Sequence, residues 1–239
     1  MIGHIAEPPV DFCAEINAFV SKHDEAAPIE FETKAVPSID YRKLSEIFES
    51  TGSTKDFSGR PFYLPRQKVN TDELIPAEYL TEVDKKSFGA HLLEGIVVDP
   101  EERKVLEHSK IIVSDIGFGD GSSREQAPWA LEGAGIGINC VIAKSFERIF
   151  ETNFVNTGNL PVTLPTEIVD ELFKKRPDYI KVVWDTLGDE SGYIEWRENK
   201  RYKKATFELS GFLKTIIRKG GSTGVMLKLA TELQAEGKI

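Results

Sequence analysis

A run of aliphatic residues, Lys110–Asp115 (KIIVSD), passes almost directly into a glycine-rich loop, Gly117–Ser123 (GFGDGSS). The run has the composition of a buried strand, and the residues after the loop favour a helix. Pro128 lacks an amide hydrogen and is therefore compatible only with the first turn of this helix. The helix thus begins shortly after the two serines. A strand, a tight glycine turn and a helix in this order indicate a mixed α/β fold.

From Pro61 onwards the rest of the chain continues this mixed pattern. The predicted strands lie at 62–64, 136–143, 160–164 and 180–185, and a hairpin joins 192–196 to 203–209 around Glu198 and Asn199. The predicted helices lie around 85–93 and over 145–154, 166–175, 212–218 and 225–233. Ser145 is the predicted cap of the helix over 145–154. Trp129 and Phe146 are expected in the core.

Residues 1–59 differ from the rest of the chain. Asp11 can cap an amphipathic helix, and a second one fits 40–50, with an irregular, proline-containing stretch between them. The stretch that follows has the composition of a linker. Because two short helices rarely form a core of their own, we expect them to dock on the main domain or on a partner. The chain is therefore divided into a helical N-terminal extension with linker (1–59) and a mixed α/β domain (60–239).

Composition and charge narrow the class of protein. Apolar residues make up 40% and charged residues 29%, as in soluble globular proteins. No apolar run approaches the ~20 residues that a bilayer span requires. The N-terminus has neither the basic start nor the apolar core of a secretory signal, so we expect a cytoplasmic protein. The net charge of −9 argues against nucleic-acid partners and anionic membranes.

The cysteine and histidine content bears on metal binding. The two cysteines, Cys13 and Cys140, are too few for a disulfide framework, and too few for an iron–sulfur cluster or structural zinc bound by this chain alone. The four histidines are scattered, without the spacing of metal ligands. We therefore expect this chain to bind no metal by itself.

The glycine-rich loop has the composition of an anion site. Its glycines, within Gly117–Gly121, allow positive φ angles and close backbone approach, and Ser122, Ser123 and Arg124 follow just before the helix. Amides at a helix N-terminus attract anions, and a guanidinium can hold a carboxylate through two parallel hydrogen bonds. The Walker lysine and the GxGxxG spacing of nucleotide-binding loops are both missing. The expected ligand is a small anion, a carboxylate or a phosphate. In the alternative, structural interpretation, the glycines only make a tight turn and a serine caps the helix.

Three stretches, in this order along the chain, resemble one known family. Asn70–Pro76 (NTDELIP) is similar to the NxDTDxIIP-like element of isopropylmalate isomerase small subunits. Gly117–Trp129 (GFGDGSSREQAPW) resembles the GSSRE signature of the aconitase swivelling domain, and Ala143–Val162 resembles the family's A-x-S-[FY]-x-x-I-x-x-x-N element. The resemblance implies a three-layer β/β/α swivelling domain.

The resemblance also implies a function. A swivelling domain that is a separate chain pairs with a large subunit whose cysteines hold a 4Fe-4S cluster, in agreement with the few cysteines here. The paired enzyme is a hydro-lyase that dehydrates a small hydroxy di- or tricarboxylate and can re-add water at the neighbouring carbon. We therefore expect a small subunit of the isopropylmalate isomerase type. Two alternatives stay open: a partner subunit of an aconitase or homoaconitase, and a stand-alone binding module without catalysis.

The resemblance assigns roles to individual residues. Ser122 is the base that removes a proton α to a carboxylate, and the loop amides and Arg124 would stabilise its alkoxide as an oxyanion hole does. Gly121, Ser123 and Arg124 would bind the substrate, with the latter two as carboxylate ligands. Asp72 matches the acidic residue that lies beside the family's active site and orients catalytic groups. Its alternative role is a local Asx turn.

Some positions depart from the family's pattern. Asp120 stands where cysteine is common and adds negative charge beside the expected anion site. The arginine that aconitases use for the distal carboxylate has no counterpart, although Lys85 or Lys86 could replace it. This difference favours a substituted malate over a tricarboxylate. Three further polar residues are interpreted as surface or bracing residues: Lys144, Arg148 and Asn153.

Overall fold

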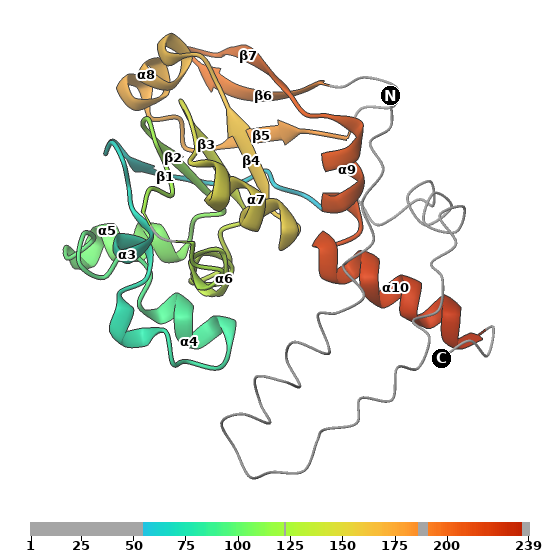
Figure 1. Cartoon of the computed structure of the whole chain (residues 1–239). Helices are drawn as coiled ribbons and strands as arrows, with labels where there is room; N and C mark the ends of the chain where they lie inside the picture. The colour runs from blue at the N-terminus through green and yellow to red at the C-terminus, as the bar shows by residue number, and fades with distance from the viewer. Residues whose placement is uncertain (1–54, 122, 186–190, 236–239) are drawn as a thin grey trace, which may run out of the picture. The chain divides into compact units, whose positions relative to one another are not determined.

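The computed structural model describes residues 55–121, 123–185 and 191–235 (Figure 1). The first elements are β1 (Pro61–Leu64), α3 (Thr71–Leu74), η1 (Ala77–Tyr79), α4 (Lys85–Ala90), α5 (Pro100–Glu107), β2 (Ile111–Ser114) and α6 (Gln126–Gly133). They are followed by β3 (Cys140–Ala143), α7 (Arg148–Asn156), β4 (Leu160–Thr163), α8 (Thr166–Lys175), β5 (Ile180–Val183), β6 (Ser191–Glu198), β7 (Arg201–Glu208), α9 (Gly211–Arg218) and α10 (Gly221–Ala235). The predicted helical extension lies outside the described residues. Within the described ranges, no helix combines the length and apolarity that a bilayer crossing needs.

The centre of the domain is a parallel sheet in the order β1-β2-β3-β4. Side chains alternate between its faces, so that Ile111 and Val113 point to one core cluster and Ile112 to the other. All residues of β2 and β3 are buried. Because a parallel sheet is covered on both faces, its strands are continuous apolar runs, and this is why KIIVSD can be identified from sequence.

A second sheet, antiparallel and in the order β5-β6-β7, covers one face of the parallel sheet. Ile194 and Phe207 are buried in the same core cluster as Ile111 and Val113. Helices α3 to α7 cover the opposite face, where their apolar side chains surround Ile112. Figure 1 shows the resulting order of layers: antiparallel sheet, parallel sheet, helices. The predicted three-layer β/β/α swivelling fold is confirmed.

Helices α4 and α6 cross at two glycines. A methyl group at Gly133 would lie 1.5 Å from the carbonyl oxygen of Lys85, and one at Gly89 would lie 2.0 Å from the carbonyl carbon of Gly133. The two backbones therefore approach as closely as only glycine permits. This crossing fixes the segment after α3 against the helix that follows the predicted anion site.

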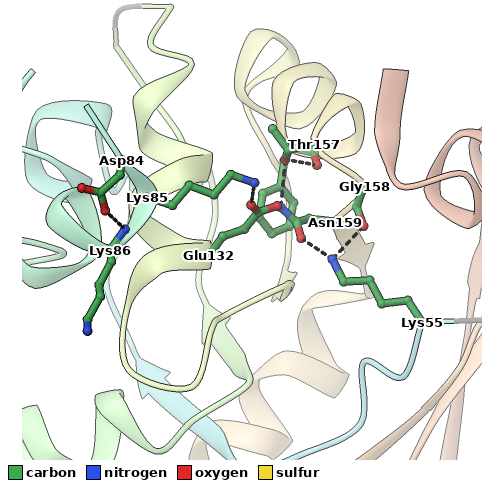
Figure 2. Close-up of polar contacts among 9 residues, drawn as sticks. Lys55, Asp84, Lys85, Lys86, Glu132, Thr157, Gly158 and Asn159 are labelled. Carbon is green, nitrogen blue, oxygen red and sulfur yellow. Dashed lines mark hydrogen bonds and ion pairs between the residues drawn. The ribbon is translucent and has the colours of Figure 1, made fainter. Parts of the chain in front are cut away.

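The folded domain begins before residue 60, the start predicted from composition. Phe57 is fully buried in the core between the two sheets. The ammonium of Lys55 donates to Oδ1 of the fully buried Asn159 at 3.1 Å (Figure 2), and burial lowers the pKa of this lysine. Residues 55–59 thus pack as part of the domain rather than as a linker.

Two elements begin three or four residues later than predicted. The strand predicted over 136–143 begins only at Cys140, because two glycines before it adopt φ angles of 52° and 89° and turn the chain. The helix predicted from Ser145 begins at Arg148, so Ser145 is not its cap. Before α7 the chain is instead extended, and Phe146 forms a parallel bridge with Phe118 of the glycine-rich loop.

Helix α5 is absent from the predicted elements although its sequence carries a start signal. The side chain of Asp99 accepts hydrogen bonds from the amides of Glu101 and Glu102, at 2.9 and 3.0 Å, and Pro100 occupies the first turn. An aspartate followed by proline and two acidic residues favours a helix N-terminus. The signal was therefore available in the sequence.

Candidate anion-binding site at the glycine loop

Residues 115–121 comprise the two residues before the glycine-rich loop and its first five residues, and this segment is called the glycine loop. It follows β2 and runs between two other segments at the carboxyl end of the parallel sheet. On one side, the amide of Thr71 donates to the Asp120 carbonyl at 2.8 Å and joins the start of α3 to the loop. On the other side, the amide of Glu147 donates to the Phe118 carbonyl at 3.0 Å. The three motif segments of the sequence therefore meet at one place in the fold.

Most amides of the loop are already occupied. The four amides of Gly117–Asp120 donate to oxygen atoms of Ser145 and Val69 at 2.8 to 3.1 Å. The amide of Gly121 donates to the side-chain carboxylate of Asp120 at 2.9 Å. The amides available to an anion therefore start at Gly121, where the ligand would replace the carboxylate of Asp120.

Two glycines of the loop are required for different reasons. Gly119 has a φ of +88°, and a methyl group there would lie 2.2 Å from Cγ of Phe150. Gly121 has a φ of +96°, but its nearest neighbour would be Oγ1 of Thr71 at 3.5 Å, which is ordinary contact. Gly119 thus allows a close approach to α7, whereas Gly121 is needed for its backbone angle alone.

The structure brings Arg124 and Asp72 together. Nη1 of Arg124 lies 2.5 Å from Oδ1 of Asp72 and donates to the carbonyl oxygen of Ile75 at 3.3 Å. The arginine side chain is 16% exposed and the aspartate side chain 55%, so the guanidinium is largely enclosed while its carboxylate partner faces solvent. A largely enclosed guanidinium that already pairs with a carboxylate has the chemistry of a carboxylate site.

The capping role in α3 belongs to Asn70 rather than to Asp72. The Asn70 side chain accepts from the Glu73 amide at 2.7 Å, and the Glu73 carboxylate accepts from the Asn70 amide at 2.9 Å, which is a complete capping box. Asp72 is thereby left to pair with Arg124. Its side chain makes an ion pair between motifs in place of the alternative local turn.

An open cavity of about 560 Å³ lies against the glycine loop. Its wall is formed by Gly119, Asp120 and Gly121 on one side and by the first turns of α7 on the other. Arg148 and Asn153 line this cavity, so the interpretation of both as bracing residues alone is incomplete. Asn153 is the last residue of the family's A-x-S-[FY]-x-x-I-x-x-x-N element, whereas Arg148 stands at one of its variable positions, and helical spacing alone does not reveal which side of α7 faces the loop.

The two predicted serines follow the glycine loop directly. Ser123 is exposed, between the loop and the first turn of α6. Ser122 lies outside the described residues. Gly121 is exposed at the edge of the cavity. Of the predicted site residues that the structure describes, all lie in or beside the glycine loop.

Lys85 is engaged away from the site. Its ammonium pairs with the carboxylate of Glu132 in the last turn of α6 (Figure 2), whereas Arg124 precedes the first turn of that helix. Lys86 lines a different cavity, beside the crossing of α4 and α6. Neither lysine is thus placed to bind the distal carboxylate of a ligand held by Arg124.

Lys144 is not a solvated lysine. Its side chain is 13% exposed, and its ammonium lies 2.9 Å from Oδ1 of Asp115 and 2.6 Å from Oδ1 of Asp170. Asp115 is the first residue of the glycine loop. The interpretation of Lys144 as surface is therefore wrong.

The described residues do not form a site for a metal cluster. Cys140 is fully buried within β3, and burial raises the pKa of its thiol. A thiol in this environment is a poor metal ligand, because ligation requires the thiolate. Across the described ranges, no group of three or more histidine, cysteine or acidic side chains is placed to hold a metal. Cys13 lies outside these ranges.

Comparison with known proteins identifies the family. The model of the Aconitase C-terminal domain matches residues 54–167. Among curated proteins, the chain is 36% identical over 133 residues to the 3-isopropylmalate dehydratase small subunit of Pelagibacter ubique, covering 51% of this chain and 64% of that protein. It is 40% identical over 117 residues to that of Granulibacter bethesdensis, covering 46% and 55%. It is 33% identical over 186 residues to that of Campylobacter jejuni subsp. doylei, covering 71% and 88%.

A solved structure extends these matches to nearly a whole protein. The crystal structure of 3-isopropylmalate dehydratase from Methanocaldococcus jannaschii superposes with a TM-score of 0.59 at 30% identity, over 77% of this chain and 99% of that one. The chain spans less than two thirds of the Pelagibacter and Granulibacter relatives, at 64% and 55% of their length, but most of the Campylobacter one. The motifs that meet at the glycine loop, the layered fold and these matches lead to one conclusion: the chain belongs to the 3-isopropylmalate dehydratase small-subunit family, which is built on the aconitase C-terminal domain.

Proposed function

We propose that this chain is the small subunit of a heteromeric iron–sulfur hydro-lyase of the isopropylmalate isomerase type. Its substrate would be a hydroxy dicarboxylate, a substituted malate, and the reaction would belong to leucine biosynthesis. The observation that carries the proposal is the largely enclosed guanidinium of Arg124, paired with Asp72 from another motif at 2.5 Å beside the glycine loop. The names of the relatives support the same reaction class.

Each site residue has a role in this proposal. Ser122 takes the proton from the carbon next to a substrate carboxylate, and the electron pair left behind forms the double bond as the hydroxyl leaves the neighbouring carbon. Arg124 and Ser123 hold that carboxylate, with help from the amide of Gly121. Asp72 orients the guanidinium. The guanidinium and the positive end of α6 also stabilise the alkoxide of Ser122, since an unaided serine hydroxyl is far too weak a base.

The 4Fe-4S cluster belongs to a large subunit in this proposal. The support is chemical: Cys140 is buried in the sheet, and the described residues offer no other set of ligands. The cluster would act as a Lewis acid toward the departing hydroxyl. The same proposal places the complex in the cytoplasm without nucleic-acid or membrane partners, in keeping with the net charge of −9.

The pairing of Lys85 with Glu132 favours a dicarboxylate substrate. An aconitase-type tricarboxylate needs a further cationic partner for its distal carboxylate, and this lysine is engaged at the far end of α6. Lys85 therefore gives the aconitase and homoaconitase alternative no support, and Arg148 in the wall of the cavity is the cation that would have to supply it.

The experiment is co-expression with a candidate large subunit, anaerobic cluster reconstitution and a screen of hydroxy di- and tricarboxylates. We expect turnover of a substituted malate. Ser122→Ala should lower kcat by about 10²- to 10⁴-fold, the usual contribution of a positioned base, with an intact complex. Ser222→Ala, at an exposed serine on α10, is the matched control and should leave kcat unchanged.

Two outcomes would contradict the proposal. Near-normal turnover of the Ser122→Ala enzyme would remove the assigned base. A chain that binds hydroxy acids but never forms a complex with a large subunit would instead be a stand-alone binding module.

A further inference from the structure

We propose that Lys144 is a positioning residue for this site: its ammonium ties the first residue of the glycine loop to α8 and so sets the direction in which the loop leaves the sheet. Neither the motif assignments nor the relatives give this lysine a role. Its effect on turnover rests on the proposed function, whereas its effect on the loop does not.

The register of the parallel sheet places the lysine beside the start of the loop. Val113 of β2 is paired with Ile142 of β3. Asp115 and Lys144, which follow these two strands, are therefore neighbours at the carboxyl end of the sheet. The ammonium lies 2.9 Å from the carboxylate of Asp115. The same carboxylate accepts from the amide of Ile116 at 2.8 Å. One carboxylate thus joins the lysine to the backbone of the loop.

A second carboxylate anchors the other side of the lysine. Oδ1 of Asp170, on α8, lies 2.6 Å from the ammonium. The side chains of Lys144 and Asp115 are 13% and 16% exposed, so the ion pair between these two is less screened than a surface ion pair, whereas Asp170 is 56% exposed. The hydrogen bonds with Asp170 and Asp115 raise the pKa of Lys144, which keeps the ammonium charged. Burial opposes ionisation of Asp115, but the hydrogen bonds from Lys144 and from the Ile116 amide still lower its pKa.

Ser145, the residue after Lys144, also binds the loop. Oγ of Ser145 accepts from the Gly117 amide at 2.9 Å, and its carbonyl oxygen accepts from the Phe118 amide at 3.1 Å. Two consecutive residues after β3 therefore contact the beginning of the loop: Lys144 through an ion pair, and Ser145 by accepting hydrogen bonds from two loop amides. Loss of the ammonium would leave two carboxylates without their shared cation, and the loop would shift at Asp115.

The decisive variants are Lys144→Met, which keeps the length and removes the charge, and Lys144→Arg, which keeps the charge. Lys203→Met is the matched control, because Lys203 also bridges two carboxylates, those of Glu171 and Glu198, but on β7 and away from the loop. Hydrogen exchange on the full chain alone, without a large subunit, measures the loop directly. For Lys144→Met we expect roughly tenfold faster exchange at the Ile116–Phe118 amides and unchanged exchange at Val162 in β4.

The reconstituted enzyme supplies the second measurement. Lys144→Met should lower kcat by about 10- to 100-fold and change KM by less than about threefold, because the loop is misplaced while the carboxylate ligand Arg124 remains. Lys144→Arg should restore most of kcat. Lys203→Met should match the wild-type enzyme in both measurements.

Three results would overturn the inference: unchanged loop exchange in Lys144→Met, accelerated exchange that extends to Val162 in β4, or a loosened loop with normal kcat. A wild-type complex without hydro-lyase activity would count against the proposed function instead. The exchange comparison would still decide whether Lys144 positions the loop.

Discussion

Arg124 has its guanidinium paired before any ligand arrives. The carboxylate of Asp72 lies 2.5 Å away, and the Ile75 carbonyl accepts at 3.3 Å. The amide of Gly121 is likewise bonded to the carboxylate of Asp120. Two acidic side chains of the chain itself thus occupy the groups that would bind a substrate carboxylate, and substrate must share or displace them.

At Arg124, a conservative change should be costly. Arg124→Lys replaces a planar fork by a point charge, which cannot contact Asp72 and a substrate carboxylate in the same geometry. We expect KM to rise by about 10- to 100-fold, the equivalent of one charged hydrogen bond. Steady-state kinetics of the reconstituted enzyme provide the measurement. Arg66→Lys, at an exposed arginine paired with Glu73, is the control, and equal effects of the two changes would contradict the assignment.

The two loop glycines should respond differently to alanine. Gly119→Ala places a methyl group 2.2 Å from the Phe150 ring at a φ of +88°, and should lower the free energy of unfolding by about 3 kcal/mol or more. Gly121→Ala meets only an unfavourable φ of +96° and should cost about 1–2 kcal/mol. Urea denaturation of both variants tests the difference. Equal losses of unfolding free energy in the two variants would mean that the close contact with Phe150 adds nothing to the cost of Gly119→Ala.

Among the elements, α6 links the site to the rest of the helical layer. Its first turn follows Arg124, and its last turn meets α4 at Gly133 and carries Glu132, the partner of Lys85. Glu132 also accepts a hydrogen bond from Asn159 at 2.6 Å, and Oδ1 of Asn159 in turn accepts one from Lys55, as the dashed lines in Figure 2 indicate. The helix is thus held at its far end by α4 and by the residues that precede β4, which keeps its first turn in place.

The crossing of α4 and α6 predicts a large effect of a single methyl group. In Gly133→Ala the new Cβ would lie 1.5 Å from the Lys85 carbonyl oxygen, so the helices must separate. We expect a loss of about 3 kcal/mol in the free energy of unfolding, measured by chemical denaturation. Gly95→Ala is the control, because among the described residues a Cβ there has nothing within 4 Å. Similar values for both variants would show that the crossing adjusts without cost.

For the molecule as a whole, a network of charges joins the second sheet to α8. Lys175 and Lys203 both pair with Glu198 at the end of β6, and Lys203 also pairs with Glu171 on α8. Hydrogen bonds from Lys175 and then Lys203 lower the pKa of Glu198 from 4.5 to about 2. The antiparallel sheet is therefore joined to α8 by ion pairs whose strength depends on pH.

The sign of this dependence follows from the direction of the shift. Because the folded pKa of Glu198 lies below the unfolded value of 4.5, its carboxylate stabilises the fold above that pH, and the contribution is lost as the pH falls towards about 2. In Glu198→Gln the free energy of unfolding should decline less over this window than in the wild type. Urea midpoints across the acidic range provide the measurement, with added salt weakening the difference. Glu195→Gln, on the same strand, should decline as the wild type does.

The sequence by itself determined most of the order of the elements and the place of the candidate site. The aliphatic run before the glycine loop, Pro128 in the first turn of a helix, and the alternation of β6 are local patterns, and local chemistry is sufficient to read them. The start of α5 is also a local pattern, because Asp99 and Pro100 are adjacent in the sequence and together favour a helix N-terminus. Glycine placement similarly indicated the turn that leads to Arg124.

Only the tertiary structure decided which side chains meet. Asp72 pairs with Arg124, Lys144 with Asp115 and Asp170, and Lys85 with Glu132, and each pair joins segments far apart in the sequence. A charged residue on a helix or after a strand has no local signal for its partner, since the partner depends on how the elements pack. Solvated and paired lysines are therefore alike in the sequence, and the burial that distinguishes them arises only when the sheets and helices come together.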